Sequence, residues 1–517
     1  MSTDISALNN RPVIIGGGAA GLMTALQLAP EPVLLLSKAP LGADASSLWA
    51  QGGLAAAMGD DDAPALHLAD TLTAGVDLCD EAVATRIVDA APAAVEHLAR
   101  LGVAFDRRPD GGWRLGLEAA HGRHRIVHAT GDGTGREIMR ALIAAVRRCP
   151  SITLLEGVEA RSLVVEDNAI KGVLAANADG PLVIDSGRVV LATGGIGGLF
   201  LDSTNPAGCF GQGLALAARA GAKLSDLEFV QFHPTAFDGP SRPMPLVTEA
   251  VRGDGATLID ETGLRFMADQ PGAELAPRDI VARAVWHRRA EGHRVFLDAR
   301  THPGVEFAKR YPVISAFCKM AGIDPATDPI PVRPAVHYHM GGIAVDAEGR
   351  STVDGLWACG EVSRTGLHGA NRLASNSLME AIVCAQWVAE SVEGASRGPL
   401  KARATLTPLP ASDASVVRPI LSQGLGVLRD RHGIERTIRG LYPIATGNSA
   451  ASDPALVGLM IAVAALGREE SRGGHYRTDF PDTLPAAVPS TLTLADALAV
   501  ARELFGTTSL SVGSTRS

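Results

Sequence analysis

Short apolar runs alternate with helix-length amphipathic stretches in the first part of the chain, which is typical of a parallel α/β sheet. Val13–Ile15 predicts a buried strand, Leu22–Ala29 a helix and Val33–Leu36 a second strand. The turn between the first strand and the helix has the spacing G-x-G-x-x-G. Glycines in such a βαβ turn let a pyrophosphate approach the backbone at the helix N-terminus. The turn therefore predicts dinucleotide binding, and the alternative is a tight turn without a ligand.

The same alternation continues toward the middle of the chain. Helices are predicted at Ala63–Ala74, at Glu81–Leu101 and from Gly131–Arg136 to about Arg148. Four short strands follow as a predicted β-meander, at Ile152–Leu155, Ala160–Val165, Gly172–Asn177 and Leu182–Asp185. Val189–Ala192 predicts one more strand, and it runs into a Thr-Gly-Gly turn where backbone can lie close to a cofactor.

The pattern changes between about His233 and Pro334, where prolines, turn dipeptides and charged residues become frequent. Strands are predicted there at Thr257–Asp260 and Arg294–Asp298, and helices at Arg278–Glu291 and Phe307–Ala321. The glycine-rich style then returns, with a strand and turn at Gly355–Gly360 and a helix at Leu373–Val392. This change predicts an inserted domain. A Pro-rich linker near Leu400–Pro410, a helical tail at about Ser415–Ala465 and Leu492–Phe505, and a disordered end from Gly506 complete the prediction.

Composition and charge narrow the range of functions. The 517 residues carry a net charge of −9, which disfavours binding to nucleic acid or to an anionic membrane. The six cysteines form no C-x-x-C pair, and no apolar run is long enough to span a bilayer. We therefore expect a cytoplasmic protein without a membrane partner. His121, His124 and His128 are close in sequence but lack the spacing of metal ligands, so no metal is expected.

Four stretches contain residues that core or surface roles do not explain. They are Ala50–Gly53, His233–Thr235 with Thr248–Gly253, Pro277–Arg283, and the segments from His337 through Gly360-Glu361 to Leu378. In this order they resemble the succinate dehydrogenase/fumarate reductase flavoprotein family, from about Pro12 to Glu393 and again at Ser471–Arg477.

The resemblance implies an α/β fold with three parts. A Rossmann-like FAD-binding domain (1–235 and 340–398) would be interrupted by an α+β capping domain (236–339) and followed by a helical C-terminal domain (410–510). The residues that the resemblance assigns to FAD are Gly16, Gly17, Gly18, Ala19, Ala20, Gly21, Ser37, Lys38, Ser46, Ser47, Ala50, Gln51, Gly52, Gly53, Thr193, Gly194, Gly195, Gln212, Glu361, Ser377 and Leu378. Gln212 departs from the family, which usually has aspartate there.

The position of Ser46 indicates a branch of the family. Respiratory members tether FAD covalently through a histidine four residues before the alanine of A-Q-G-G, and this chain has Ser46 at that position. We therefore expect FAD to be bound non-covalently. The scattered cysteines and the lack of a membrane span also disfavour a respiratory subunit. The resemblance is closest to the branch that oxidises L-aspartate.

A C4 dicarboxylate needs cations and hydrogen-bond donors at both ends, and arginine has the planar fork that fits a carboxylate. The resemblance assigns Arg278 to the reacting carbons and Glu118 to the α-ammonium of aspartate. It assigns the substrate carboxylates to His233, Thr248, Glu249, His337 and Arg372. Without this context, Arg278 would be a surface ion-pair partner and the histidines would be satisfied core residues.

The implied reaction is FAD-dependent oxidation of L-aspartate to iminoaspartate, the first step of NAD biosynthesis through quinolinate. Oxygen or fumarate would reoxidise the flavin, and quinolinate synthase is the partner that such a pathway implies. One alternative is a soluble fumarate reductase or succinate oxidase. The other is a flavin-binding protein without activity, which predicts loss of the substrate cations, whereas Arg278, His337 and Arg372 are all present.

Overall fold

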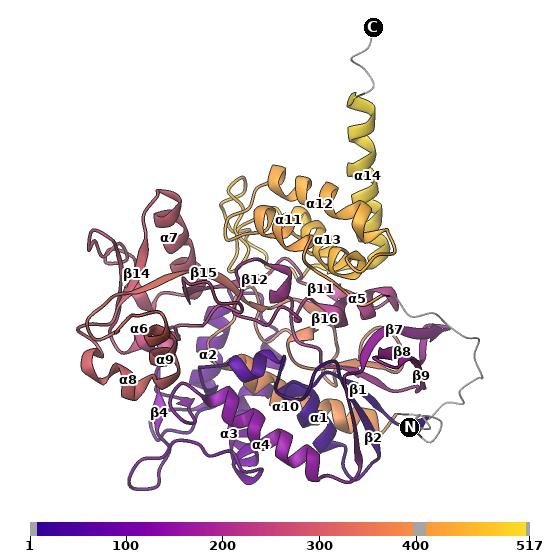
Figure 1. Ribbon diagram of the computed structural model, residues 1–517, viewed down its shortest axis with the longest axis horizontal. Helices are drawn as coiled ribbons and strands as arrows, with labels where there is room; N and C mark the ends of the chain where they lie inside the picture. Colours follow the sequence, from indigo (N-terminus) through magenta and orange to yellow (C-terminus); the bar gives the residue numbers. More distant parts are fainter. Residues whose placement is uncertain (1–7, 396–409, 513–517) are drawn as a thin grey trace.

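The computed structural model describes residues 8–395 and 410–512, without the side chains of 507–512 (Figure 1). A five-stranded parallel sheet with the order β17-β10-β1-β2-β6 lies at its centre. Its strands are β1 (Val13–Ile15), β2 (Val33–Ser37), β6 (Ile152–Glu156), β10 (Val189–Leu191) and β17 (Leu356–Ala358). The predicted α/β fold class is confirmed.

The central strands are buried on both faces, and alternate residues enter different hydrophobic cores. Ile14 and Leu35 belong to the core formed with the helices, whereas Val13 and Leu36 belong to the core shared with the meander and the tail. The helices that form the first of these two cores with the sheet are α1 (Ala19–Gln27), α3 (Glu81–Arg100), α4 (Thr134–Arg148) and α10 (Asn376–Glu393). Helix α2 (Pro64–Ala74) packs on α3. This arrangement explains why the strand sequences are apolar throughout rather than alternating.

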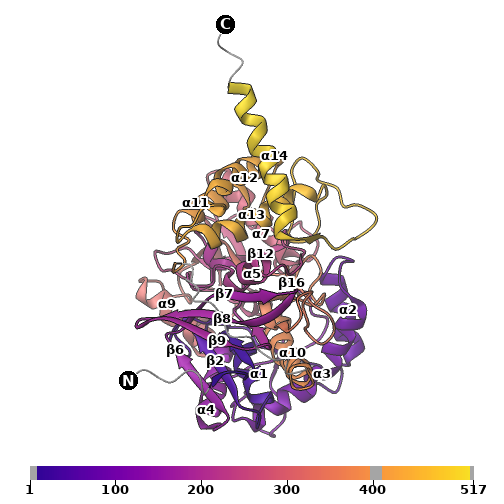
Figure 2. The ribbon, with the colours of Figure 1, turned by 90° about the vertical axis from the view of Figure 1, so that its right-hand side faces the viewer.

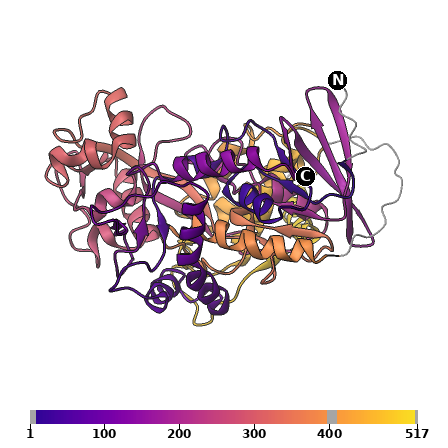
Figure 3. The same ribbon diagram turned by 90° about the horizontal axis from the view of Figure 1, so that it is seen from below.

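The predicted four-stranded meander is wrong in its first member. β6 pairs with β2 in parallel, with Leu34 opposite Thr153, because α4 is the crossover that returns the chain in the same direction. Only β7 (Glu159–Glu166), β8 (Ala169–Asn177) and β9 (Gly180–Asp185) form the antiparallel meander. Seen from below, this meander and the inserted part lie at opposite ends of the molecule (Figure 3).

The inserted part is built on two long strands that the sequence did not predict. β12 (Val230–Phe237) and β15 (Ile330–His339) pair antiparallel, and β14 (Val295–Asp298) and β13 (Thr257–Asp260) extend the sheet. Pro234, Pro331 and Pro334 lie within the two long strands, and proline normally argues against a strand because it cannot donate to the ladder. Register shifts along β12 accommodate this irregular pairing.

The helices of the inserted part are α6 (Glu249–Gly253), α7 (Arg278–Ala290), α8 (Phe307–Arg310) and α9 (Pro312–Met320). The single helix predicted over Phe307–Ala321 is wrong. Tyr311 leaves the helical region, with φ −127° and ψ 64°, because a residue before proline is disfavoured there.

The tail forms a helical layer beside the central part (Figure 2). Its helices are α11 (Val417–Gly424), α12 (Arg431–Ala445), α13 (Ser452–Gly467) and α14 (Leu494–Val512). α13 is buried on almost every side between α12 and α5 (Gln212–Arg219), which explains its nearly uniform apolar sequence. α14 continues through Gly506, so the first residues expected to be disordered are helical. Residues 513–517 and nearly all of the predicted linker lie outside the described residues.

Several two- or three-residue strands complete the structure. β3 (Leu54–Ala55), β5 (Ile126–Val127) and β4 (Leu115–Gly116) form one small sheet, and β18 (Ser363–Arg364), β16 (Gly342–Ala344), β11 (Leu224–Ser225) and β19 (Thr491–Leu492) form another. Within residues 8–395 and 410–512, no helix combines the length and apolar character needed to cross a bilayer.

Candidate active site

A large cavity begins at the carboxyl ends of the central strands and extends to the start of α7. The carboxyl ends of parallel strands are where open α/β sheets bind ligands. Most of the site residues predicted from the sequence line this cavity: Gly16, Gly17, Gly18, Ala19, Ala20, Ser37, Lys38, Ser46, Ser47, Ala50, Gln51, Gly52, Gly53, Glu118, Thr193, Gly194, Gln212, Thr248, Arg278, His337, Glu361, Arg372, Ser377 and Leu378.

Four predicted residues lie behind the lining instead. Gly21 packs against Gly16, where an added Cβ would collide with the Gly16 carbonyl oxygen. Gly195 lies against Glu361, and His233 and Glu249 lie behind other predicted substrate residues. These four therefore shape or support the cavity rather than face it.

The N-terminal glycine turn brings the first turn of α1 to the cavity. Gly16 has φ +130°, and an added Cβ there would collide with the Ala192 carbonyl oxygen. Gly18 is the N-cap of α1 and supplies no side chain to the first helical N–H groups. Among the described residues, the Ser47 hydroxyl accepts from the Ala19 N–H at 3.2 Å. A helix start of this kind is suited to an anionic pyrophosphate.

Two buried side-chain atoms support the fit of a polar cofactor. The Gln51 Oε1 and Thr193 Oγ1 atoms are buried, and neither has a hydrogen-bond partner in the part of the chain that the structure describes. Buried polar atoms normally have a partner, so both are candidates for contact with a bound group. Ser46 also lines the cavity, and its Oγ lies 3.3 Å from the Cys209 sulfur.

The side chains of Gln212 and Lys38 donate hydrogen bonds to other residues of the protein. The Gln212 amide donates to Glu159 Oε1 at 2.9 Å and to the Ala160 carbonyl at 2.8 Å. Lys38 donates to the Gly208 carbonyl. The aspartate usual in the family could not donate to these two oxygens. Both hydrogen bonds therefore depend on the glutamine that this chain has at position 212.

Glu361 is a buried carboxyl in the cavity wall. Its Oε1 accepts a hydrogen bond from the His339 N–H at 3.0 Å. Gly195 leaves the room that this carboxyl occupies, since an added Cβ would collide with it. Burial raises the pKa of Glu361 from 4.5 to about 7.

This pKa predicts a pH-dependent stability of the FAD-free protein. Between pH 4.5 and 7 the folded protein keeps a proton that the unfolded chain releases, so the free energy of unfolding falls as pH rises through that range. Glu361→Gln should match the wild type at pH 4 and exceed it by about 3 kcal/mol at pH 8 in urea unfolding. An unchanged difference at the two pH values would contradict this.

Two arginines from distant segments converge on one glutamine. The Gln231 Oε1 atom accepts from Arg278 Nη1 at 3.0 Å and from Arg372 Nε and Nη2 at 3.2 and 3.1 Å. Burial and the charge of Arg278 lower the pKa of Arg372 to about 10. Both guanidinium groups also line the cavity, which matches the demands of a dicarboxylate. Sequence reasoning missed Gln231, which lies two residues before His233.

Glu249 is an ion-pair partner behind the arginines. Its two oxygens pair with Arg278 Nε and Arg252 Nη2, each at 2.8 Å. Although burial opposes it, Arg278 and Arg252 hold the pKa of Glu249 below its usual value. Its placement supports a role in fixing Arg278 rather than in direct contact with a carboxylate.

The two predicted histidines lie together, with ring centroids 5.2 Å apart. Burial and the nearby arginines hold the pKa of both His233 and His337 well below 6.5, so both are neutral. His233 Nδ1 accepts from the Thr235 N–H at 3.2 Å, which leaves its proton on Nε2. That buried Nε2 has no partner among the described residues. Both rings are therefore uncharged, and His337 is the one that lines the cavity.

Within the described structure, one of the two carboxylate oxygens of Glu118 has a hydrogen-bond partner and the other has none. Ser375 Oγ donates to Glu118 Oε2 at 2.7 Å and accepts from the Gly53 N–H at 3.1 Å. Glu118 Oε1 is buried without a partner in the described structure. Burial and the charge of Glu249 raise the pKa of Glu118. Ser375 has φ 61°, which explains why α10 begins at Asn376, three residues later than predicted.

A buried ionic cluster supports the loop that carries Ser375. Arg125 is fully buried and pairs with Asp62 at 2.9 Å and with Asp70 at 2.6 Å. His121 Nε2 lies 3.0 Å from the Ala374 carbonyl, and Arg125 lies behind His121. In the part of the chain described, no three His, Cys, Asp or Glu side chains form a group that could hold a metal.

Arg125→Met should strongly destabilise the protein because it leaves two carboxylates without their counter-ion. Breaking a buried pair in this way costs about 3–5 kcal/mol, which denaturant unfolding would measure. Arg108→Met is the control, because the Arg108–Asp110 pair is exposed and should contribute less than about 1 kcal/mol. Equal losses for the two variants would show that the cluster has no special role.

Comparison with known proteins agrees with this geometry. A family model described as an FAD binding domain matches residues 11–378, and a model of the fumarate reductase flavoprotein C-terminus matches 452–497. The chain is 61% identical to an L-aspartate oxidase of Mesorhizobium japonicum, over 96% of this chain and 97% of that protein. It is 53% identical to an L-aspartate oxidase of Agrobacterium fabrum, over 98% of each.

Solved structures show the same fold. A quinol fumarate reductase chain of E. coli superposes with a TM-score of 0.84 at 28% identity, covering 94% of each chain. Sdh1 of Mycobacterium smegmatis superposes with a TM-score of 0.77 at 30% identity, again covering 94% of each. FAD is therefore the cofactor of this fold and of this chain. The chain belongs to the L-aspartate oxidases, within the succinate dehydrogenase/fumarate reductase flavoprotein family.

Proposed function

We infer that the protein oxidises L-aspartate to iminoaspartate with FAD, as the first step of NAD biosynthesis through quinolinate. The observation that carries this inference is Glu118, a carboxyl with a buried, unpartnered oxygen in the same cavity as Arg278 and Arg372. Two cations suit the two carboxylates of aspartate, and one acidic group suits its ammonium. Succinate has no ammonium for Glu118 to bind. The relatives named L-aspartate oxidase support the same reaction.

The site residues divide the work of substrate binding. Arg372 and Arg278 bind the carboxylates, with Gln231 holding the two guanidinium groups in place. The neutral His337 and the Thr248 hydroxyl add uncharged donors, and His233 packs against the His337 ring in the layer behind them. Glu118 Oε1 would receive the ammonium group and so fix the orientation of the substrate in the cavity. FAD, when bound, would supply the two-electron acceptor for the oxidation.

The raised pKa of Glu118 also suits it to proton exchange with the amine, which must lose a proton when the imine forms. Arg278 is fixed by its ion pair with Glu249 at 2.8 Å. This arrangement supports a binding and charge-stabilising role for Arg278 during aspartate oxidation.

FAD is proposed to bind without a covalent link. The α1 N-terminus and Ser37–Lys38 would hold the pyrophosphate and adenosine, and Ser46–Gly53, Glu361 and Ser377–Leu378 the flavin side. Ser46 provides no imidazole for a tether. The three-domain division given above is likewise our proposal, and the separate hydrophobic core of the inserted part, between Phe237 and Val332, supports it.

Oxygen or fumarate is proposed as the electron acceptor, and fumarate is favoured by the likeness to a fumarate reductase. We place the reaction in the cytoplasm, consistent with six free cysteines. A quinolinate synthase is the proposed consumer of the product.

Anaerobic mixing of the purified yellow protein with L-aspartate tests the function. Bleaching of the flavin absorbance by L-aspartate, and its return on adding oxygen or fumarate, is expected. Bleaching by succinate alone would instead favour a succinate oxidase. Acid precipitation in the same experiment should release all FAD into the supernatant, and flavin retained in the pellet would contradict non-covalent binding.

A further inference from the structure

The segment Arg472–Tyr476, here called the tail turn, lies outside the cavity but contacts both elements that carry the substrate arginines. The turn closes on itself through reciprocal backbone hydrogen bonds between Arg472 and His475, at 2.8 and 3.0 Å. It belongs to the Ser471–Arg477 stretch that stood out in the sequence, and no residue of it lines the cavity. Any effect of the tail turn on substrate binding must therefore act through the residues that it contacts.

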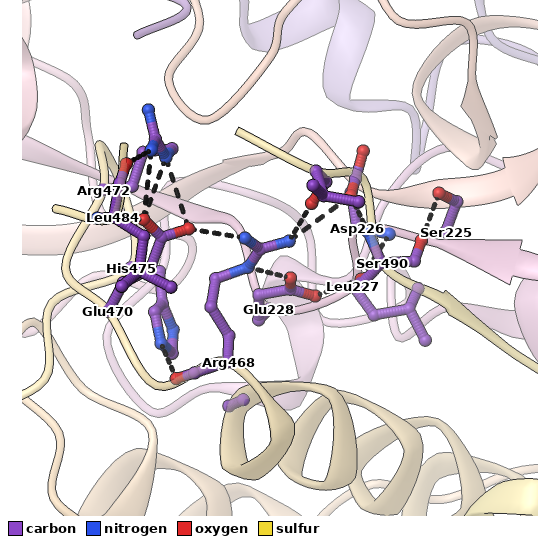
Figure 4. A network of polar contacts seen from close by, with 12 residues as sticks. Ser225, Asp226, Leu227, Glu228, Arg468, Glu470, Arg472, His475, Leu484 and Ser490 are labelled. Carbon is purple, nitrogen blue, oxygen red and sulfur yellow. Dashed lines mark hydrogen bonds and ion pairs between the residues drawn. The ribbon is translucent and has the colours of Figure 1, made fainter. Parts of the chain in front are cut away.

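Buried ion pairs anchor the tail turn (Figure 4). Arg472 pairs with Glu470 at 3.1 Å, and both side chains are 1% exposed. Arg472 also donates to the Val76 carbonyl at 2.8 Å and to the Leu484 carbonyl at 2.7 Å. Arg468 links Glu470 to Glu228, which precedes β12. The turn is thus fixed to the central part of the molecule.

One side of the tail turn holds the loop that ends in Arg372. The Gly474 N–H donates to the Ala370 carbonyl at 2.8 Å. Gly473 has φ +50°, and an added Cβ there would collide with the Ala370 carbonyl. The Ala370 N–H donates in the opposite direction, to the Gly75 carbonyl at 2.9 Å. The loop is therefore clamped two residues before Arg372.

The other side of the tail turn holds α7, whose first residue is Arg278. Arg283, on α7, donates to the Gly473 carbonyl at 3.3 Å, and its guanidinium lies 5.0 Å from the Tyr476 ring centroid. Arg283 also pairs with Asp279 at 2.9 Å. Asp279 in turn accepts from the Asn371 amide at 3.1 Å.

We propose that the tail turn and Arg283 form a latch that holds Arg278 and Arg372 at the spacing required by the substrate, with Arg283, Asp279 and Tyr476 as positioning residues. The proposal rests on the proposed function for its substrate. α7, the Arg372 loop and the tail turn come from three separate parts of the chain, so their contacts fix the relative placement of the two arginines. Displacements of about 1 Å at such a site can cost about 100-fold in rate.

Arg283→Gln in the FAD-loaded protein tests the latch. It should lower kcat/KM for L-aspartate about 30-fold and weaken succinate binding, followed by flavin absorbance, about tenfold, at unchanged FAD content. Arg283→Lys keeps a cation for Asp279 and should recover part of the loss. Arg289→Gln is the matched control on the same helix, because Arg289 pairs with Asp238 and does not reach the tail turn.

A double-mutant cycle with Tyr476 separates positioning from general stability. Tyr476→Leu should reduce succinate binding, Tyr476→Phe should not, and Tyr476→Leu combined with Arg283→Gln should be little worse than Arg283→Gln alone. Additive losses, or equal losses in Arg289→Gln, would overturn the proposal. A lower melting temperature with unchanged kcat/KM would also overturn it. Succinate binding tests the latch even if the wild type fails to oxidise aspartate, so the two failures are distinguishable.

Discussion

Arg372→Met should lower kcat/KM for L-aspartate about 1000-fold while leaving the protein folded and loaded with FAD. Arg372 lines the cavity, and a guanidinium can make a bidentate contact with a substrate carboxylate. Loss of such a buried, charge-assisted contact costs about 4 kcal/mol, which corresponds to the expected factor.

The stability of the substrate-free protein should not fall in parallel. Burial and the neighbouring Arg278 lower the pKa of Arg372 to about 10, so its charge is unfavourable until an anion binds. Methionine fills a similar apolar volume against the Tyr338 ring, over which the guanidinium lies at 4.6 Å. Steady-state kinetics and thermal unfolding measured on the same preparation check both statements. A loss below tenfold would remove Arg372 from the proposed carboxylate site.

Glu118→Gln should separate aspartate oxidation from fumarate reduction. The variant keeps the volume and an oxygen that can accept from Ser375, but it loses the negative charge proposed to bind the ammonium. We expect kcat/KM for L-aspartate to fall about 100-fold, and fumarate reduction by chemically reduced enzyme to change less than about threefold.

The pH profile provides a second measurement of the same role. Burial and Glu249 raise the pKa of Glu118, while Arg278, Ser375 and Arg372 oppose that rise. Aspartate oxidation should therefore decline as pH falls through this raised pKa, because protonation removes the charge. The variant should lack this acidic limb. Equal losses for aspartate and fumarate would instead favour a general structural role for Glu118.

The sequence determined those features whose requirements are local. The glycine turn was predictable because no side chain fits at Gly16 or Gly21, whatever lies elsewhere in the chain. The central strands and most helices were predictable from the apolar period, and α3 agrees with its prediction to within one residue. The stretches around Arg278, His337 and Arg372, taken in their order along the chain, pointed to a flavoprotein. This was possible because each stretch holds its polar and charged site residues within a short segment.

Only the tertiary structure decided how those segments meet. β12 and β15 contain prolines, which argue against a strand, so local pattern did not predict them. The role of Gln231 on β12 was therefore not predicted either. β6 joined the central sheet because its pairing depends on the α4 crossover and not on its own residues.

The same reason separates residues that face the cavity from those behind it. His233 and Glu249 carry the expected chemistry, but partners from other elements place them in a supporting layer. The tail turn contacts the loop of Arg372 across about a hundred residues of chain, through a backbone hydrogen bond that no side-chain pattern records. The sequence thus specified the chemical groups and the cofactor, while long-range packing and pairing set the distances between those groups.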